Sequence, residues 1–424
     1  MDRFLIRGGR VLSGRVATAS AKNAVLPILA ACLLTGETCT IRNVPRLEDV
    51  KTMLRLLQTL GVTVEWSGRT VRVTAKGKLS LKAPYDIVRK MRASYYVLGP
   101  LLARFGDCLV SLPGGCAIGP RPVDLHLRGI EALGARVSVE HGYIHAQGRP
   151  LKGGRVFLEG VKGPSVGATI NTLMAATLAR GKTVIEGAAC EPEVVDVARF
   201  LKTLGAEIKG AGTPTITING RRELHGASHR PIPDRIEAGT LAVAAAITGG
   251  KVEIVRCRPR HLGAVIELLR QVGAEVITGR QSLTVAMKGR AKPVDIATGP
   301  YPSFPTDLQA QFTSLLSLAD GTSVVTENIF ESRFLHCLEL NRMGANIELA
   351  GSHAIIHGVD RLSGAQVMAS DLRASAALVL AGLAAEGETE ILRIYHLDRG
   401  YERLEEKLTG LGAEIERVSP RSNA

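Results

Sequence analysis

An internal repeat of about 70 residues constrains the fold of this chain more than any other feature. An amphipathic run that ends in Gly-(Ala)-x-(Ile/Val) occurs six times, for example as LQTLGVTV and LKTLGAEI. Successive glycines of this phrase are 73, 71, 68, 71 and 68 residues apart, at Gly61, Gly134, Gly205, Gly273, Gly344 and Gly412. A fixed period of this kind indicates that one supersecondary unit is repeated along the chain.

A second phrase has the same period. An Ala/Leu-rich run followed by x-Gly-x and a β-branched stretch places its glycines at Gly36, Gly106, Gly181, Gly250, Gly321 and Gly387. The glycines of both phrases fit the left-handed position that ends a helix. Alternating apolar residues before and after short turns, as in VTVEW-SG-RTVRVTA, predict paired strands. Each unit therefore reads as βαβαββ, which makes the chain an α/β protein of six repeats.

The sixth unit stops at GAEIERVSPRSNA and has no returning strand of its own. The N-terminal FLIRGGRVLSGRVATAS resembles AIIHGVDRLSGAQVMAS near the sixth unit. We therefore expect a strand near Phe4–Arg7 to complete that unit. Six units divide most simply into two domains of three repeats, residues 21–229 and residues 1–20 with 230–424. The chain would then cross between the domains twice, which favours a cleft between them.

Composition limits the possible functions. Lys and Arg exceed Asp and Glu by 53 − 40 = 13, which suggests an anionic partner. Aromatic residues make up 4% of the chain, few for a protein that stacks on unpaired bases. The seven cysteines include no CxxC pair, so neither a disulfide framework nor a zinc site is indicated. The charged N-terminus and short apolar runs predict a cytoplasmic protein without a signal peptide or membrane span.

Cations occur where helices are expected to begin. Counting back from the repeat glycines places six basic residues in first helical turns, namely Lys22, Arg92, Arg121, Arg260, Arg373 and Arg399. A cation at a helix N-terminus opposes the helix dipole by about 0.3–1 kcal/mol, so these positions suggest an anion held by cations and helix N–H groups together. The alternative is a set of surface ion pairs, for example Arg373 with Asp371.

Two further residues have candidate chemical roles. Asp307 in FPTDLQAQF breaks the basic pattern and is either a helix cap beside Thr306 or a general base. Cys116 lies in SLPGGCAIGPRPVDLH, where glycines and prolines exclude a helix or a central strand. An isolated cysteine is usually a core residue, but basic neighbours in an exposed loop would favour a reactive thiolate.

Seven phrases resemble the enolpyruvyltransferase family, in particular its members that act on UDP-N-acetylglucosamine. They are ASAKNAVLPILAACLL, MRASYYVLGPL, LPGGCAIGPRPVDLH, FPTDLQAQF, ESRF, DLRASAALVLAG and YHLDRGYERLEEKL. The resemblance implies an inside-out α/β barrel of two domains with three βαβαββ units each. It also implies transfer of the enolpyruvyl group of phosphoenolpyruvate to the 3-hydroxyl of UDP-N-acetylglucosamine, with release of phosphate, at the start of peptidoglycan synthesis.

The resemblance further assigns roles to residues. It implies that Cys116 is the general acid, forms a covalent adduct with phosphoenolpyruvate and is alkylated by the epoxide antibiotic fosfomycin. It implies that Asp307 is the base and that Lys22, Arg121 and Arg399 bind phosphoenolpyruvate. The remaining substrate-binding residues that it implies are Asn23, Arg92, Pro122, Val123, Asp124, Leu125, Ser165, Val166, Gly167, Ile329, Arg333, Asp371 and Arg373. Neither a metal nor an organic cofactor is expected, because an acid, a base and a cationic clamp suffice for this addition and elimination.

Two alternatives remain open. A related enolpyruvyltransferase that acts on shikimate 3-phosphate would share the six-unit fold and the basic site, but it lacks the cysteine loop. A nucleic-acid-binding repeat protein would also be basic, although it would carry basic runs and stacking aromatic residues, and Trp66 is the only tryptophan here. The loop VKGPSVG is longer than in some members of the family, so contact between Lys162 and a nucleotide is an open point.

Overall fold

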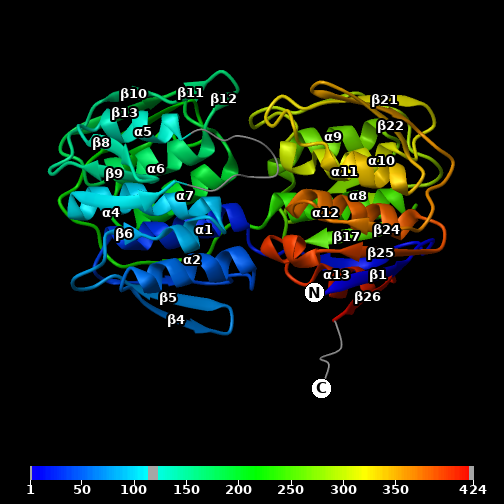
Figure 1. The fold of residues 1–424 in the computed structure, drawn as a ribbon, viewed down its shortest axis with the longest axis horizontal. Helices are drawn as coiled ribbons and strands as arrows, with labels where there is room; N and C mark the ends of the chain where they lie inside the picture. The colour runs from blue at the N-terminus through cyan, green and yellow to red at the C-terminus, as the bar shows by residue number, and fades with distance from the viewer. Residues whose placement is uncertain (1, 113–122, 420–424) are drawn as a thin grey trace. The chain divides into compact units, whose positions relative to one another are not determined.

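The computed structural model describes residues 2–112 and 123–419 (Figure 1). The described chain divides into two compact units. The central unit contains residues 20–112 and 123–232, and the terminal unit contains residues 2–19 and 233–419. The repeat predicts these boundaries after residues 20 and 229.

Each unit contains three four-stranded sheets that share one topology. An edge strand runs parallel to a second strand, which pairs antiparallel with a third, and the third pairs antiparallel with the fourth. In the central unit the sheets are β16(Ser228–His229)-β3(Thr38–Ile41)-β5(Thr70–Thr74)-β4(Thr63–Ser67), β6(Lys82–Ala83)-β7(Asp107–Ser111)-β9(Tyr143–Gln147)-β8(Arg136–Glu140) and β10(Arg155–Phe157)-β13(Lys182–Glu186)-β15(Thr215–Asn219)-β14(Glu207–Lys209). In the terminal unit they are β2(Ser13–Ala17)-β17(Lys251–Val255)-β19(Ser282–Ala286)-β18(Glu275–Thr278), β20(Ile296–Ala297)-β21(Thr322–Thr326)-β23(His353–His357)-β22(Asn346–Ala350) and β24(Gln366–Met368)-β25(Glu388–Leu392)-β1(Arg3–Arg7)-β26(Glu414–Val418).

The N-terminal strand β1 completes the sixth repeat, as the phrase similarity predicts. Phe4 pairs with Ile391 of β25 and with Arg417 of β26. The first and fourth repeats exchange their parallel edge strands. The strand that precedes the first repeat in the chain joins the sheet of the fourth, and the strand that precedes the fourth joins the sheet of the first. Strand β2 pairs with β17, and β16 pairs with β3, so each segment that crosses between the units leaves a strand in the unit from which the chain departs.

The Ala/Leu-rich helices lie inside each unit, with the sheets around them (Figure 1). In the terminal unit α8 (Arg235–Ile247), α10 (Gln309–Leu316) and α12 (Leu372–Ala384) contact one another and are buried along almost their whole length. A helix that is apolar on every side is stable only when it is buried, which places the predicted Ala/Leu runs at the centre. The α/β class with three repeats in each unit is therefore confirmed.

Both units have inner helices and a second set of helices. In the central unit the inner helices are α1 (Lys22–Ala31), α4 (Leu98–Phe105) with the preceding 3₁₀ turn η2 (Arg92–Val97), and α6 (Val166–Ala176). The second helices of the repeats are α2 (Glu48–Thr59), α5 (Asp124–Glu131), α7 (Pro192–Thr203), α9 (Gly263–Gln271), α11 (Leu335–Arg342) and α13 (Leu404–Thr409). Smaller elements are η1 (Cys32–Leu34), α3 (Tyr85–Val88), η3 (Pro259–His261), η4 (Thr306–Leu308), η5 (Ile394–Arg399) and the hairpin β11 (Glu159–Gly160) with β12 (Gly163–Pro164).

The repeat glycines mostly behave as predicted. All six glycines of the first phrase have φ between 82° and 102°, the left-handed region that ends a helix. In the second phrase the prediction is wrong at Gly36 and Gly250, which are absent from the positive-φ positions. Gly250 is needed for another reason, because a Cβ there would lie 2.1 Å from the carbonyl oxygen of Leu12.

Candidate active site

The predicted first-turn positions of the inner helices are confirmed. Lys22 begins α1, and Arg92 begins the η2 turn that leads into α4. Gly167 and Arg373 are the second residues of α6 and α12, and Asp307 lies in the η4 turn that precedes α10. Local helical geometry thus brings these side chains to one end of the helix bundle within each unit.

The prediction for the second helices is wrong in the terminal unit. Arg260 lies in the η3 turn, and α9 begins three residues later, at Gly263. Arg399 ends the η5 turn and precedes α13 by five residues. Arg403, directly before α13, has φ 46°, a left-handed conformation that cannot continue a helix. Arg399 is therefore held by an irregular segment rather than by a helix N-terminus.

Asp307 lies between two buried arginines in the terminal unit. Its Oδ1 is 2.9 Å from an Arg333 nitrogen, and its Oδ2 is 2.9 Å from an Arg373 nitrogen. The arginine side chains are 6% and 3% exposed, whereas Asp307 is 26% exposed. Two cations and one carboxylate leave a net charge of +1 around a partly exposed Asp307 side chain. This arrangement can hold an anionic reactant next to a proton acceptor.

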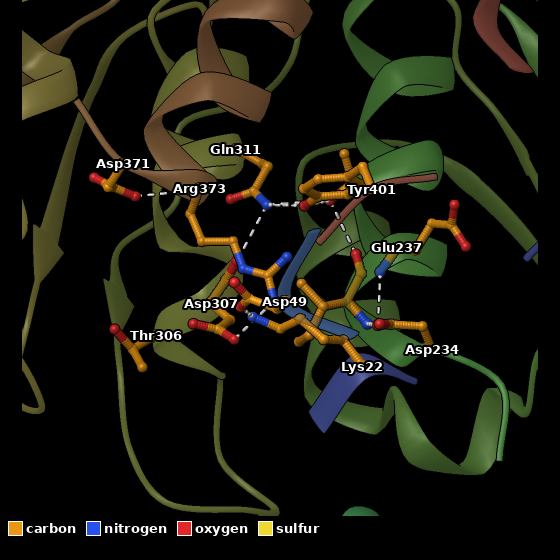
Figure 2. A network of polar contacts seen from close by, with 12 residues as sticks. Lys22, Asp49, Asp234, Glu237, Thr306, Asp307, Gln311, Asp371, Arg373 and Tyr401 are labelled. Carbon is orange, nitrogen blue, oxygen red and sulfur yellow. Dashed lines mark hydrogen bonds and ion pairs between the residues drawn. The ribbon is translucent and has the colours of Figure 1, made fainter. Parts of the chain in front are cut away.

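The surface-pair alternative for Arg373 is wrong. Asp371 caps α12 and accepts the backbone N–H of Arg373 at 2.8 Å, while the guanidinium reaches Asp307, as Figure 2 shows. Burial by itself would lower the pKa of Arg373, but Asp307 and other anionic groups raise it above its ordinary value. The cap alternative for Asp307 is also wrong, since no side-chain cap precedes η4 or α10.

A hydroxyl cluster lies behind this arginine. Tyr401 is fully buried, and its hydroxyl contacts Thr240 at 2.8 Å. The same hydroxyl contacts Gln311 at 3.2 Å (Figure 2). The Gln311 amide also donates to the backbone oxygen of Asp307 at 3.1 Å. The Arg373 guanidinium lies 5.4 Å from the centre of the Tyr401 ring. The cluster fixes both the backbone of Asp307 and the position of its cation.

Asp371 and Arg399 lie close to two histidines of the terminal unit. Burial is the main cause that lowers the pKa of His336, to about 4, with Asp371 opposing the shift and Arg333 adding to it. Burial and then Arg399 lower the pKa of His396, which Asp371 opposes. Both histidines are therefore neutral at pH 7. The cationic charge around Asp307 in the terminal unit therefore comes from arginines.

In the central unit, Lys22 pairs with Asp49. The Lys22 Nζ lies 3.1 Å from Asp49 Oδ2, and the two side chains are 12% and 5% exposed. Asp49 is the second residue of α2, so the first turns of two helices meet at this pair. Asn23 follows Lys22 in α1 and is half-buried. The ion pair fixes the direction of a lysine whose position at a helix start is otherwise unfavourable.

Arg92 lies close to a buried histidine of α5. The Asn171 amide donates to Nδ1 of His126 at 2.9 Å, so the neutral ring carries its proton on Nε2. Burial, and then the charge of Arg92, lower the pKa of His126 to about 3. Val123, Asp124 and Leu125 form the start of the same helix, and Asp124 is exposed. This helix start is thus anchored on α6 by His126.

The segment Ser165–Gly167 opens α6. The Ser165 hydroxyl caps the helix by accepting the N–H of Ala168 at 3.3 Å. Val166 and Gly167 are half-buried, and a Cβ on Gly167 would lie 2.9 Å from the His126 ring. Only glycine permits this close approach of α6 to α5. The free N–H groups of such a helix start are suited to anion binding.

Some predicted residues cannot be placed. Cys116, Arg121 and Pro122 lie outside the described residues. Lys162 is exposed in the hairpin between β11 and β12. Within residues 2–112 and 123–419, no group of three or more His, Cys, Asp and Glu side chains is arranged to hold a metal ion. No helix in the same ranges combines the length and the apolar character needed to cross a membrane.

Sequence reasoning missed several residues that support the site. They are Asp49, His126, Asn171, Thr240, Gln311, Glu327 and Tyr401. Most are polar residues inside otherwise apolar runs, such as the asparagine in GATINTLMAA and the glutamines in DLQAQF. A buried polar residue needs a partner, so an unexplained polar position in a core helix is the signal that could have found them.

The comparisons with known proteins agree on one kind of enzyme. A family model described as EPSP synthase (3-phosphoshikimate 1-carboxyvinyltransferase) matches residues 6–408. UDP-N-acetylglucosamine 1-carboxyvinyltransferase 2 from Carboxydothermus hydrogenoformans is 55% identical, and a protein named UDP-N-acetylglucosamine 1-carboxyvinyltransferase from Gluconacetobacter diazotrophicus is 56% identical. Each alignment covers 99% of this chain and 100% of the relative.

Solved structures show the same fold. The enolpyruvyl transferase NikO from Streptomyces tendae has a TM-score of 0.89 at 26% identity, over 99% of both chains. EPSP synthase from Acinetobacter baumannii has a TM-score of 0.75 at 20% identity, over 99% of this chain and 100% of that one.

Proposed function

Since the chain belongs to the EPSP synthase family of enolpyruvyl transferases and, within it, to the UDP-N-acetylglucosamine 1-carboxyvinyltransferases, we propose that it makes the enolpyruvyl ether of UDP-N-acetylglucosamine. The donor is phosphoenolpyruvate, the acceptor is the 3-hydroxyl of the sugar, and phosphate is released. The observation that carries this acceptor is the identity of 54–56% over almost the full chain to three relatives with this name.

The proposed reaction is an addition followed by an elimination. Addition protonates C3 of phosphoenolpyruvate and joins C2 to the sugar oxygen, whose proton leaves to a base. Elimination breaks the bond between C2 and the phosphate oxygen and removes a proton from C3. The sum is an enol ether and phosphate, with no change of oxidation state. The protein has to supply an acid, a base and cations that hold the reacting anions.

We assign these roles from the family motifs and from the geometry within each unit. Cys116 is the acid and the site of a covalent adduct, and Asp307 is the base. Lys22, Arg121 and Arg399 bind phosphoenolpyruvate. The arginines on both sides of Asp307 support its role, because they hold the carboxylate in one orientation and leave a net positive charge beside it. Proton transfer is efficient only when the base is oriented in this way.

The nucleotide sugar is proposed to occupy the remaining positions. The start of α5 and the start of α6 lie against each other at His126 and Gly167, so their free N–H groups are suited to a diphosphate. The residues proposed to contact it are Asn23, Arg92, Arg121, Pro122, Val123, Asp124, Leu125, Ser165, Val166, Gly167, Asp307 and Ile329, with Arg333, Asp371 and Arg373 around Asp307. Both small-molecule substrates are anionic, in keeping with the net charge of +13.

We further propose that the reaction is the first committed step of peptidoglycan synthesis and takes place in the cytoplasm.

Phosphate release with each acceptor tests the proposal. The full-length protein and phosphoenolpyruvate are mixed with UDP-N-acetylglucosamine or with shikimate 3-phosphate, and the product is identified by mass spectrometry. We expect phosphate release and a mass gain of one enolpyruvyl group only with the nucleotide sugar. Turnover of shikimate 3-phosphate would instead establish the alternative acceptor. Steeply salt-dependent RNA binding without phosphate release would establish a nucleic-acid-binding protein.

A further inference from the structure

Glu327 is a buried carboxylate that directly follows β21 in the terminal unit. It is 0% exposed and accepts four hydrogen bonds. Its Oε1 accepts from the Thr298 hydroxyl at 2.8 Å and from the N–H groups of Ile329 and Phe330 at 2.8 and 3.0 Å. Its Oε2 accepts from the Thr306 hydroxyl at 2.8 Å. Among the described residues no Lys, Arg or His nitrogen forms an ion pair with it, so hydrogen bonds alone balance its burial.

The directions of these hydrogen bonds follow from their partners. The Thr298 hydroxyl accepts the backbone N–H of Asn328 at 2.9 Å, and the Thr306 hydroxyl accepts an N–H of Arg333 at 3.0 Å. Both nitrogens can only donate, and each hydroxyl has one proton. The two hydroxyl protons are therefore directed to Glu327, which is the common acceptor of the network.

One oxygen of Glu327 thus holds the loop that contains Ile329 and Phe330, and the other oxygen contacts Thr306, next to Asp307. Oε1 fixes the backbone at Ile329, a proposed sugar contact. Oε2 orients Thr306, and the Arg333 nitrogen that donates to Thr306 lies 2.9 Å from Asp307 Oδ1. A continuous relay runs from Glu327 through Thr306 and Arg333 to the proposed base.

We propose that Glu327 is a positioning residue of the transfer reaction, which it serves by holding Arg333 against Asp307 through the Thr306 hydroxyl. The inference rests on the proposed function and deepens it. Glu327 is 0% exposed, so its effect on the reaction is indirect. It acts on the orientation of the base, and a 1 Å displacement of reacting groups costs on the order of 10²-fold in rate.

Glu327→Gln separates the relay from the loop. An amide has one oxygen, and three of the four donors face the Oε1 position. The amide oxygen therefore takes that position and retains the contacts to Ile329 and Phe330. The amide NH₂ then faces Thr306, whose hydroxyl already accepts from Arg333. The proton of the Thr306 hydroxyl then has no acceptor, which breaks the relay. The hydrogen bonds to Ile329 and Phe330 are retained.

The experiment compares Glu327→Gln, Thr306→Val and the double variant in the phosphate-release assay, with thermal melting of each protein. We expect kcat to fall on the order of 10²-fold in each single variant, with little change in KM for either substrate. The double variant should be no slower than the single ones, because both changes break one relay. Asp295→Asn is the matched control. The Oδ1 of Asp295 accepts the N–H of Val324 in β21, three residues before Glu327, at 2.8 Å. The Asp295→Asn protein should keep wild-type kcat.

The outcomes are distinct. A folded Glu327→Gln protein with wild-type kcat would overturn the inference, and so would losses in the two single variants that multiply in the double variant. If Glu327→Gln does not fold, Thr306→Val carries the test by itself, with the same expected loss of kcat and with wild-type kcat as the contrary result. A wild type that releases no phosphate with the nucleotide sugar would overturn the proposed function first, and the inference with it.

Discussion

Arg373 donates to Oδ2 of Asp307 at 2.9 Å, although the two residues are 66 positions apart in the chain. Arg333 occupies the other oxygen of the same carboxylate. With both oxygens held, Asp307 has a fixed direction in the terminal unit. Each of its partners is more deeply buried than Asp307 itself, so the cations cannot turn to solvent when a substrate leaves.

Asp307→Asn should reduce kcat by roughly 10²–10⁴-fold, because an amide cannot accept the hydroxyl proton. The variant should also be less stable than the wild type, because Arg333 and Arg373 lose the anion that they share, so thermal melting must show that it is folded at the assay temperature. Phosphate release at saturating substrates measures the effect. Asp320→Asn is the control, as this aspartate is 82% exposed and pairs with Arg290 at the surface. Equal activity in the two variants would exclude Asp307 as the base.

Arg373→Met should destabilise the protein by about 1.5–3 kcal/mol, because Asp307 loses one of its two charged hydrogen bonds and keeps the one from Arg333. Urea unfolding of the variant and the wild type gives the difference. Arg361→Met is the matched control, since Arg361 is 72% exposed and pairs with a similarly exposed Glu386. Exposed pairs contribute about 0–1 kcal/mol. A similar small loss in both variants would show that burial of Arg373 is not important for stability.

Lys22→Met should lower kcat/KM for phosphoenolpyruvate by roughly 10–100-fold, the value of one charge-assisted hydrogen bond to an anion. The measurement is the initial rate of phosphate release against phosphoenolpyruvate concentration. Lys51→Met is the matched control, because Lys51 pairs with Glu48 on the exposed side of α2. An unchanged kcat/KM in Lys22→Met would remove this lysine from the donor site.

Cys116→Ala should abolish phosphate release while the nucleotide sugar still binds, since the proton donor is lost and the proposed cations remain. Calorimetric titration with UDP-N-acetylglucosamine checks the binding. Fosfomycin should add one equivalent of mass to the wild type, on the peptide that contains Cys116, and none to the variant. Cys190→Ala is the control, as Cys190 is half-buried and outside the proposed site. Normal turnover in Cys116→Ala would exclude the acid role.

Acid should destabilise the protein through His126. Burial lowers the pKa of this histidine from 6.5 to about 3, so the unfolded chain binds a proton below pH 6.5 that the folded chain rejects. Above pH 6.5 the histidine is neutral in both states and costs no stability. The free energy of unfolding then decreases as the pH falls from 6.5 toward 3. Between pH 7 and pH 4 the loss is about 3 kcal/mol.

Urea unfolding at both pH values, compared with His126→Gln, isolates this term from the carboxylates. The wild type should lose more stability than His126→Gln, and the exposed His353→Gln control should follow the wild type. Equal losses in the wild type and His126→Gln would show that His126 is protonated in the folded protein.

The repeat allowed the fold to be predicted in some detail. Gly61 and its five equivalents end helices in the left-handed region, as their phrase predicts, because the amphipathic period and the helix-ending glycine act over a few residues. The N-terminal strand was assigned to the sixth unit because its phrase matches that of another repeat. The exchange of β2 and β16 between repeats was not foreseen, since a two- to five-residue edge strand carries too little pattern to specify its partner.

Local sequence determined which side chains begin the inner helices, and therefore that Lys22, Arg92, Asp307 and Arg373 lie at helix starts. Only the tertiary structure decided what each of them contacts. The partners Asp49 of Lys22 and Arg333 of Asp307 come from other elements, and their pairing depends on how those elements pack, within distances of about 3 Å. Periodicity reports which face of an element is buried, whereas a buried hydrogen bond requires two atoms from separate segments to meet with the correct geometry.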